Sequence, residues 1–385
     1  MKIFQITTFF HPVTGGVESH VYSLTNELIR LGHNVTVLCS DSNKSGPRIR
    51  SREMNFSGIK IKRFITWFSL SYYHKFYPGL LFYLLQKDFD LLHVHGFRKF
   101  ETYIALFVGW IKKKPVVLTT HNPFPTSSRG KYNQMLVKLH DKTLGRWFTK
   151  KLSKIITIVP SEEPLFINKF NVNKKNIVRV PNGLDRRFLQ VGNKENFYKE
   201  YNVDISKWKA VVSTCCRLNY AKGVQNLKFA IDNLPDVFFV IAGGDDGYLE
   251  ELKKLYFNNQ NVYFTEKFLS PEKLIDIFAA SDVFVLPSLH EAFGIVLLEA
   301  MVQGTPVIAT NKGGPSEIIT KEVGMVIDPT NQDEWYKALT NLLDHPTKLA
   351  KMRRAAINFT NAFNWDLLGK QIENIYLNLS TKTNE

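Results

Sequence analysis

Short apolar runs alternate with longer amphipathic stretches along most of the chain. The runs are rich in Val, Ile, Leu and Phe, which is typical of buried strands. Helical periodicity lies between most of them, and strands that alternate with helices predict βα units around a mostly parallel sheet. The strands predicted in the first half are Ile3–Thr7, Val35–Leu38, Ile59–Phe64, Leu91–His95, Val116–Thr120, Ile155–Val159 and Ile177–Val180.

The second half of the chain repeats this α/β pattern. A turn at Pro181-Asn182-Gly183 separates the halves, and the polar segment 192–209 is interpreted as a linker and the start of the second half. Since 385 residues are too many for one ordinary core, we expect two domains, residues 1–187 and 188–363. The strands predicted in the second half are Ala210–Thr214, Val237–Ala242, Val262–Thr265, Val283–Leu286, Val307–Ala309 and Met325–Ile327.

The stretch PSLHEAFGIVLLEAMVQGTPVIATNKGGPSE, residues 287–317, carries the most chemistry. Two carboxylates, Glu291 and Glu299, flank the Phe293-Gly294 turn, after which an apolar helix is predicted to begin at Ile295. Free N–H groups at a helix start favour an anion such as a diphosphate, and a carboxylate suits the vicinal hydroxyls of a ribose. The alternative is that both glutamates are solvated surface charges, which the flanking strand, glycine and proline residues make less favourable.

Two further segments fit a phosphate ligand. RLNYAKG places Arg217 and Lys222 just past a predicted strand, where two cations can neutralise a diphosphate leaving group; a solvated loop would carry the same residues. At the amino end, Gly15-Gly16 lies between a strand and a helix and permits close contact with phosphate. This pair lacks the G-x-G-x-x-G spacing of a dinucleotide fold.

Together these segments resemble a family-4 glycosyltransferase of the GT-B fold. The resemblance is carried, in the family's order, by HPVTGGVESHVYSLTNEL, VPNGLD, RLNYAKG, AGGDDG and PSLHEAFGIVLLEAMVQGTPVIATNKGGPSEII, with Glu291 and Glu299 as the E-x7-E pair. It implies two Rossmann-like βαβ domains that face each other across a donor/acceptor cleft. It also implies that a final helix, about residues 364–385, crosses back to the first domain.

The resemblance implies a retaining transfer of a hexose from a nucleotide diphosphate sugar. Glu291 would contact the donor sugar and Glu299 the ribose. Arg217 and Lys222 would stabilise the charge on the leaving phosphate. His121 would lie near the donor sugar, although it also suits a turn at a strand end. The remaining donor contacts implied are Gly15, Gly16, Asn182, Gly183, Phe293, Gly294 and Ile295, and three other histidines, His11, His93 and His95, are interpreted as structural or acceptor-side.

The resemblance implies no cofactor and no bound divalent metal. An Asp-x-Asp pair of the metal-dependent kind is not identified, and Asp245-Asp246 is interpreted as a turn after a strand. The basic loop at residues 40–58 departs from the family's pattern, so the acceptor cannot be inferred from the family. Two alternatives stay open: a non-catalytic protein that binds a nucleotide sugar or glycan, and a transferase with a soluble acceptor such as a sugar phosphate.

The net charge of +15 is concentrated in the first half. Residues 1–187 hold 30 Lys and Arg against 11 Asp and Glu, whereas residues 188–385 hold 20 against 24. This asymmetry indicates contact with an anionic surface, and no nucleic-acid module is visible, so a membrane leaflet is preferred. Residues 59–87 and 129–154 interleave basic and aromatic side chains, as peripheral membrane proteins do. For either segment alone, an amphipathic helix packed into its domain is the favoured interpretation.

Cysteine content and the amino end bear on the compartment. Cys39, Cys215 and Cys216 include no Cys-x-x-Cys pair, which argues against a disulfide framework and fits a reducing cytoplasm. The opening MKIFQITTFFHP holds too short an apolar run for a signal peptide, and no run approaches the roughly 18 residues that span a bilayer. We therefore expect a cytoplasmic enzyme, peripheral at the inner membrane face, whose acceptor is a lipid-linked or membrane-associated glycan.

Overall fold

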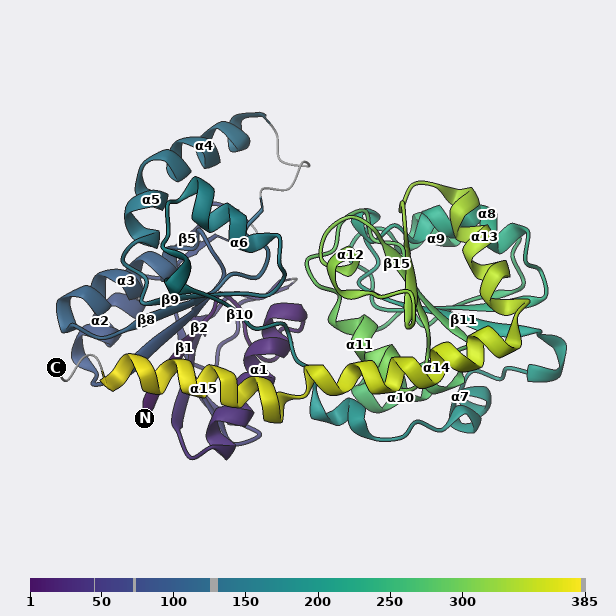
Figure 1. Cartoon of the computed structure of the whole chain (residues 1–385), viewed down its shortest axis with the longest axis horizontal. Helices are drawn as coiled ribbons and strands as arrows, with labels where there is room; N and C mark the ends of the chain where they lie inside the picture. The colour runs from purple at the N-terminus through teal and green to yellow at the C-terminus, as the bar shows by residue number, and fades with distance from the viewer. Residues whose placement is uncertain (45, 72–73, 125–130, 382–385) are drawn as a thin grey trace. The chain divides into compact units, whose positions relative to one another are not determined.

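The computed structural model describes residues 1–44, 46–71, 74–124 and 131–381. The chain divides into two compact units. Unit 1 comprises Met1–Gly183 together with Trp365–Glu385, and unit 2 comprises Leu184–Asn364. The sequence placed these divisions at 187/188 and at about 364. Each unit is an α/β structure with its own sheet and hydrophobic cores (Figure 1).

Unit 1 is built on an eight-stranded sheet in the order β10-β9-β8-β7-β1-β2-β4-β3. Neighbouring strands are parallel except for β3 and β4, which form an antiparallel pair at one edge. The order reverses between β1 and β7, and open α/β sheets bind ligands beside the carboxyl ends of the strands at such a point. The strands are β1 Lys2–Ile6, β2 Asn34–Ser40, β3 Glu53–Phe56, β4 Ile59–Phe64, β7 Leu91–His95, β8 Val116–Thr119, β9 Lys154–Thr157 and β10 Ile177–Arg179, with a separate hairpin of β5 Phe68–Ser69 and β6 Lys75–Phe76.

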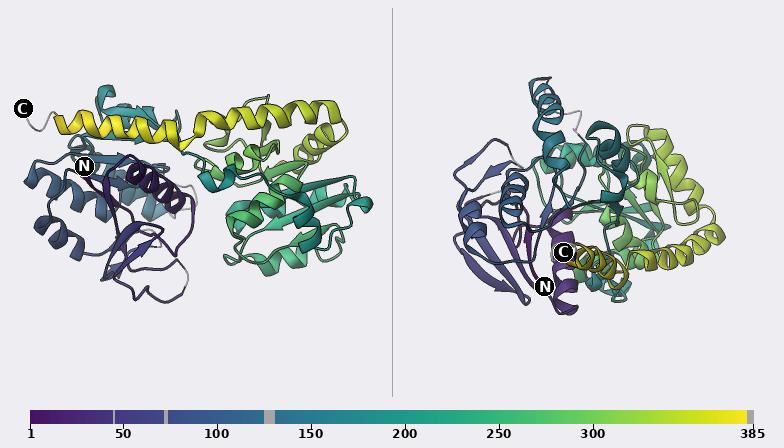
Figure 2. Two further views of the ribbon diagram at one scale, coloured as in Figure 1. Left: turned by 90° about the horizontal axis from the view of Figure 1, so that it is seen from below. Right: turned by 60° about the vertical axis from the view of Figure 1, so that its left-hand side comes forward.

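Helices cover both faces of this sheet because the apolar strands are buried on both sides. One face packs on α2 and α3, and the other packs on α1 and the carboxyl-terminal helix α15. Helix α15 ends near the C label in Figure 2. Its buried residues Trp365, Leu368, Ile372 and Tyr376 pack in the core on this face of the sheet. The helices of unit 1 are α1 Gly16–Arg30, α2 Gly79–Gln86, α3 Phe100–Lys112, α4 Lys131–Lys142, α5 Leu144–Thr149, α6 Glu162–Pro164, η1 Leu165–Lys169, η2 Lys174–Asn176 and α15 Trp365–Thr381.

Unit 2 has a six-stranded, fully parallel sheet in the order β13-β12-β11-β14-β15-β16. This is the Rossmann order, and its reversal falls between β11 and β14. The strands are β11 Ala210–Cys215, β12 Val237–Ala242, β13 Val262–Phe264, β14 Val283–Leu286, β15 Val307–Thr310 and β16 Gly324–Ile327. The helices are η3 Arg186–Leu189, α7 Lys194–Glu200, η4 Ile205–Lys207, η5 Tyr220–Lys222, η6 Val224–Leu227, α8 Lys228–Asp232, α9 Leu249–Leu255, α10 Pro271–Ala280, α11 Ile295–Val302, α12 Pro315–Ile318, α13 Gln332–Leu343, α14 Pro346–Thr360 and η7 Asn361–Phe363.

Every strand predicted from an apolar run is present, and the α/β fold class is confirmed. Three predictions of organisation were wrong. The amphipathic helix favoured over 59–87 is limited to α2, because the other described residues of this segment include β4 and the β5–β6 hairpin. The segment 192–209 is not a linker, because it contains α7, whose Phe197 is buried in a core of unit 2. The basic helix predicted over 129–154 is broken at Thr143, where the backbone leaves the helical region and the hydroxyl bonds the carbonyl of Leu139.

We predict that Ile372→Ala lowers the free energy of unfolding by about 2–4 kcal/mol, since the fully buried side chain would leave a cavity between α15 and the sheet. Urea unfolding followed by circular dichroism measures the change. Leu377→Ala, on the exposed side of the same helix, should cost less than about 0.5 kcal/mol. Equal effects of the two substitutions would show that α15 is not anchored through this face.

Candidate functional site

The loops that follow β11 and β14 meet at the strand-order reversal of unit 2. Lys222, at the end of η5, donates to Glu291 with 2.7 Å between Nζ and Oε2. Both side chains are half-buried. Ser288 donates to the same oxygen at 3.3 Å, and the amide N–H of Ala292 donates to the other carboxylate oxygen at 3.2 Å. The structure therefore brings two residues of the predicted site into direct contact.

Close backbone contact makes this pairing possible. Gly223 has a φ of +71°, and a Cβ there would lie 1.9 Å from the carbonyl oxygen of Pro287. Gly313 has a φ of +99°, and its Cβ would lie 2.1 Å from the carbonyl oxygen of Glu291. Only glycine fits such positions without strain. The Glu291 backbone is held further by its N–H to Lys312 and by the N–H of Gly314.

Electrostatics keep both members of the pair charged. Burial alone would raise the pKa of Glu291, but the charge and hydrogen bond of Lys222 outweigh it and lower that pKa. Burial likewise disfavours the Lys222 cation, yet Glu291 leaves the pKa of the lysine raised above its ordinary value. At neutral pH the site therefore presents a fixed ammonium group beside a fixed carboxylate.

Arg217 lies at the end of β11 on the loop that carries Lys222. Its guanidinium donates to Asp246 at 3.1 Å, and Asn219 donates to the same oxygen at 2.7 Å. Asp246 therefore positions Arg217, whereas Asp245 accepts three backbone N–H bonds at the start of α9. The predicted turn at Asp245-Asp246 thus has one carboxylate that caps a helix and one that orients a cation.

The predicted anion position is the start of α11. The helix begins at Ile295 after Gly294, which has a left-handed backbone, and within the described chain no side chain caps it. Its first N–H groups and dipole are therefore available to an anionic ligand. The Phe293 side chain instead packs in the core against Phe363, so its backbone alone is suited to ligand contact.

Glu299 lies one turn into α11 and differs sharply from Glu291. Burial, reinforced by the charge of Asp185 and opposed by that of Arg187, raises its pKa to about 8. Asp185 and Arg187 form their own ion pair at 2.7 Å. A pKa near 8 favours the protonated form of Glu299 at neutral pH, and this form can both donate and accept hydrogen bonds. The sequence analysis did not identify Asp185 and Arg187 as neighbours of Glu299. Asp185 is the last residue of the VPNGLD motif, and Arg187 follows it by two positions.

In unit 1 the predicted residue His121 belongs to a buried histidine cluster at the carboxyl ends of β1, β7 and β8. His121 Nε2 lies 3.1 Å from His95 Nδ1, and its ring is 4.7 Å from that of His20. His93 pairs with Tyr376 at 2.5 Å and with Thr119 at 2.8 Å. His93 and His95 were expected to be structural or acceptor-side, and the structure places them beside His121. His11 lies apart from them and stacks on Phe56.

Burial keeps the cluster uncharged. It lowers the pKa of His20 to about 4 and the pKa values of His93, His95 and His121 well below the ordinary value. His121 has a left-handed backbone (φ +47°), and the turn around it is held by Glu162, which accepts from the N–H of Asn122 at 3.1 Å. Burial raises the pKa of Glu162 to about 7. Nothing in the local sequence distinguishes Glu162 as the partner of this turn.

The other predicted contacts of unit 1 have clear local surroundings. Gly15 precedes α1 and lies against the ion pair of Lys44 and Glu18, which is 2.8 Å long. Gly16 is the first residue of that helix. Asn182 is buried beside His20. Gly183 packs on the ring of Trp365, where a Cβ would approach within 2.6 Å.

The sequence analysis overlooked one Asp-x-Asp sequence. Asp88 and Asp90 do form an Asp-x-Asp sequence, before the amino end of β7. Asp90 accepts from the backbone N–H of Lys2 at 2.7 Å, so it helps to join β1 to β7. Asp90 lies at the end of the sheet opposite the histidine cluster, and this contact gives it a structural role.

Two family descriptions match the chain. Residues 14–188 match "Glycosyltransferase Family 4", and residues 201–359 match "Glycosyl transferases group 1". The D-inositol 3-phosphate glycosyltransferase of Corynebacterium aurimucosum is 26% identical over 94% of this chain and 90% of its own. The gpi3 subunit of the phosphatidylinositol N-acetylglucosaminyltransferase of Schizosaccharomyces pombe is 23% identical over 99% and 81%.

A solved structure shows the same fold. The HepE protein of Anabaena, in complex with UDP-glucose, superposes with a TM-score of 0.75 at 19% identity, covering 99% of this chain and all of that one. The similarity extends through both units. The GT-B fold class inferred from the sequence is therefore confirmed.

We predict that Glu299→Gln raises the stability of the chain at pH 8.5, relative to its effect at pH 5, by on the order of 4 kcal/mol. A carboxyl whose folded pKa is about 8 gives its full stabilisation below its unfolded pKa of about 4.5 and loses it as the pH rises through 8. Glutamine mimics the neutral acid and does not titrate. Thermal unfolding at both pH values measures the difference.

The matched control for this prediction is Glu250→Gln, on the exposed surface of α9. Its melting temperature should follow that of the unsubstituted chain at both pH values. A difference between the Glu299→Gln variant and the parent that is the same at pH 5 and pH 8.5 would contradict the raised pKa.

Proposed function

Because the chain belongs to glycosyltransferase family 4, we propose that it is a retaining hexosyltransferase that uses a nucleotide diphosphate sugar. We further propose that its acceptor is a lipid-linked or membrane-associated glycan. The observation that carries the donor assignment is the Lys222–Glu291 pair, held at the strand-order reversal of unit 2 beside the start of α11. The complex of HepE with UDP-glucose supports a donor of this class.

The charges of unit 2 suit the departure of a nucleoside diphosphate. As the glycosidic bond to the phosphate breaks, negative charge grows on the leaving oxygen. Lys222 and Arg217, each oriented by a carboxylate, would stabilise that charge without reorganising, and the N–H groups at the start of α11 would bind the diphosphate. Glu291 would accept from sugar hydroxyls, and Glu299 would bind the ribose.

No described side chain of unit 2 is placed as an evident nucleophile, since Glu291 is engaged by Lys222, Ser288 and the Ala292 amide. We therefore propose attack on the same face that the phosphate leaves, with the leaving phosphate accepting the acceptor proton. The two oriented cations supply the charge that a diphosphate-bound metal ion would supply elsewhere. We accordingly propose that the diphosphate needs no divalent cation. His121 would lie near the donor sugar.

The surface of unit 1 supports a membrane acceptor. The aromatic side chains of segments 59–87 and 129–154 differ in exposure. Tyr77 is buried and Phe148 is half-buried, whereas Trp67 and Trp147 are more than half exposed. Tyr72, Tyr73 and Arg129 lie outside the described residues. Other exposed apolar side chains of unit 1 include Phe68, Leu70, Phe82, Phe107, Trp110, Ile111, Met135, Leu139 and Leu144.

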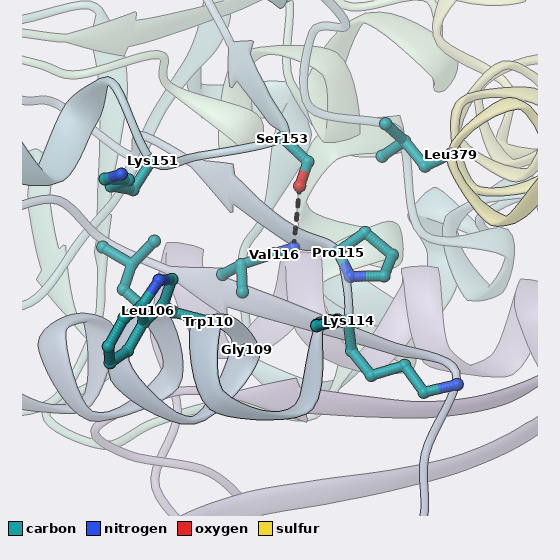
Figure 3. Close-up of a pocket in the computed structure, with 10 residues that line it drawn as sticks. Leu106, Gly109, Trp110, Lys114, Pro115, Val116, Lys151, Ser153 and Leu379 are labelled. Atoms are coloured by element: carbon teal, nitrogen blue, oxygen red, sulfur yellow. Dashed lines mark hydrogen bonds between the residues drawn. The ribbon is translucent and has the colours of Figure 1, made fainter. Parts of the chain in front are cut away.

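A basic pocket lies at the amino end of β8 and includes the exposed Trp110 in its lining. Trp110, on α3, lines it together with Lys113, Lys114 and Lys151 (Figure 3). Ser153 also lines it, and its hydroxyl accepts from the N–H of Val116 at 3.1 Å. Lysines beside exposed aromatic rings are suited to the interface of an anionic bilayer. We propose that this surface meets the headgroups of a membrane leaflet.

The cytoplasmic face is the proposed location. All three cysteines are free thiols, and none of the described helices is long and apolar enough to cross a bilayer. Free thiols are usual where the surroundings are reducing. The similarity to the gpi3 subunit of a phosphatidylinositol N-acetylglucosaminyltransferase supports an acceptor carried by a lipid.

The donor is tested first by thermal unfolding with UDP, GDP and ADP in the presence of EDTA. A nucleotide at 100 times its dissociation constant stabilises by about 2.7 kcal/mol, which corresponds to a shift of several degrees. Lys222→Met should then lower kcat with the matching donor by about 10²–10³-fold and affect nucleotide affinity less, because the charge of the leaving group develops in the transition state.

The matched control is Lys228→Met, which removes a lysine from a surface pair with Asp232 in the same unit. It should leave kcat within about twofold. Turnover by the Lys222→Met variant at the parent rate would contradict the role of Lys222. Nucleotide binding without turnover of any donor would instead favour the non-catalytic alternative.

We predict that the chain binds vesicles containing anionic lipid at low salt and releases them as salt rises. Replacing both Lys113 and Lys114 by Gln should weaken binding roughly 25-fold, at about 1 kcal/mol per lysine. Lys207→Gln, on the exposed surface of unit 2, is the control and should change nothing. Sedimentation with vesicles measures both, and absence of binding at low salt would favour a soluble acceptor.

A further inference from the structure

A chain of buried hydrogen bonds connects the carboxyl-terminal helix to His121. Gln5, on β1, lies between Tyr376 of α15 and His95 of β7. His95 in turn contacts His121. We propose that Gln5 and Tyr376 act through His95 as positioning residues. Together they fix the tautomer of His121, so that its Nδ1 accepts a hydrogen bond from a hydroxyl group of the donor sugar. This inference rests on the proposed function, in which His121 lies near that sugar.

The contacts are continuous and shielded from solvent. The Tyr376 hydroxyl lies 3.4 Å from Nε2 of Gln5, and Oε1 of Gln5 lies 2.5 Å from Nε2 of His95. His95 Nδ1 lies 3.1 Å from His121 Nε2. Gln5, Tyr376 and His95 are each at most 1% exposed. Buried polar groups are seldom left unpaired, so the direction of each bond constrains the next.

The Gln5 amide sets the direction of the chain of bonds. Its oxygen can only accept, so the His95 Nε2 that faces it carries a proton and His95 Nδ1 holds a lone pair. That lone pair accepts from the Nε2–H of His121. A neutral imidazole has one N–H group, and so the other nitrogen of His121, Nδ1, is an acceptor.

His121 must be neutral to keep this lone pair, and its surroundings keep it neutral. Burial is the largest cause of its lowered pKa, and the charges of His20, His93 and Lys99 would lower that pKa further. An imidazolium ring would offer two donors and no acceptor. The lowered pKa therefore preserves the acceptor at Nδ1 at neutral pH.

The Tyr376 hydroxyl has a second partner that agrees with this direction. Its oxygen accepts from the Gln5 amide, so its proton is donated to His93 Nδ1, 2.5 Å away. His93 Nε2–H then donates to the Thr119 hydroxyl at 2.8 Å. All three histidines on these bonds therefore have the Nε2–H tautomer. With the amide turned over, every bond would reverse and all three would carry Nδ1–H.

Nδ1 is the nitrogen of His121 that is left for a ligand. The side chain is half-buried, and among the residues that the structure describes Nδ1 has no hydrogen-bond partner. His20 holds the ring in place by packing against it at 4.7 Å and 80°. A sugar hydroxyl can donate to such a nitrogen, whereas an ionised phosphate oxygen cannot. The lone pair therefore suits the sugar rather than the diphosphate.

The tautomers are measured by NMR of the full-length protein with isotope-labelled histidine ring nitrogens, in the absence of donor and acceptor. A ring held in one tautomer gives two well separated nitrogen shifts, and exchange between tautomers draws them together. We expect the His121 signal, identified by its loss in His121→Asn, to show a fixed Nε2–H tautomer. A His121 ring that carries Nδ1–H would overturn the proposal.

Substitutions away from His121 test whether its tautomer depends on the positioning residues. Tyr376→Phe removes the hydroxyl that orients the Gln5 amide, and Gln5→Leu removes the amide itself. In both variants the two nitrogen shifts of His121 should converge. The matched control is Tyr77→Phe, which removes a buried hydroxyl of the same unit that donates to the Thr7 carbonyl at 3.3 Å, and it should leave these shifts unchanged. Parent shifts in Gln5→Leu, or in Tyr376→Phe should Gln5→Leu fail to fold, contradict the dependence.

Kinetics connect the tautomer to sugar transfer. Tyr376→Phe should lower kcat/KM for the nucleotide sugar about 2–10-fold, the value of one hydrogen bond, and leave the affinity for the nucleoside diphosphate within about twofold, since that ligand has no sugar. Tyr77→Phe should change neither quantity. A parent kcat/KM in a variant whose tautomer has shifted would rule out the contact with the sugar. If no donor turns over, the proposed function fails, while NMR still decides the tautomer of His121.

Discussion

Each unit of the chain depends on one reversal of strand order in a parallel sheet. At a reversal, successive crossover helices leave on opposite faces, so the loops at the carboxyl ends of the two central strands are not covered by either helix. In unit 2 the reversal lies between β11 and β14, whose loops carry Arg217, Lys222 and Glu291. In unit 1 it lies between β1 and β7, where the buried histidines gather.

The two positions use opposite electrostatics. In unit 2, neighbouring opposite charges outweigh the cost of burial and keep Lys222 and Glu291 ionised. In unit 1, burial is the largest cause of the lowered pKa values of His95 and His121, and neighbouring histidines lower them further. Charged groups suit a ligand that carries and develops charge, as a diphosphate does. Neutral imidazoles suit hydroxyl groups, because each ring can donate one hydrogen bond and accept another.

Much of the fold could be predicted from the sequence because its strands are buried on both faces and therefore appear as uninterrupted apolar runs. The edge strand β3 could not be, since the residues EMNF alternate between half-buried and exposed and carry no such run. The segment of α7 was mistaken for a linker because Phe197 is the one fully buried residue in a polar helix.

The candidate site also has one part that could be predicted from the sequence and one that could not. Residues 287–317 could be interpreted locally, since two carboxylates, a glycine turn and a helix start lie within one segment. The electrostatic influence of Asp185 and Arg187 on Glu299, and the convergence of His20, His95 and His121, involve residues far apart in the chain. Such proximity cannot be read from the spacing of residues within one segment, because it arises only when the chain folds.

Helix α15 has a consequence for synthesis. Its residues are the last of unit 1, yet the hydroxyl of Tyr376 bonds both to His93 and to Gln5 in the interior. The whole of unit 2 lies between them in the sequence. A ribosome therefore completes unit 2 before it releases the helix that closes unit 1. Until then the nascent amino-terminal half exposes an apolar face of its sheet, and so it is the half that we expect to need a chaperone.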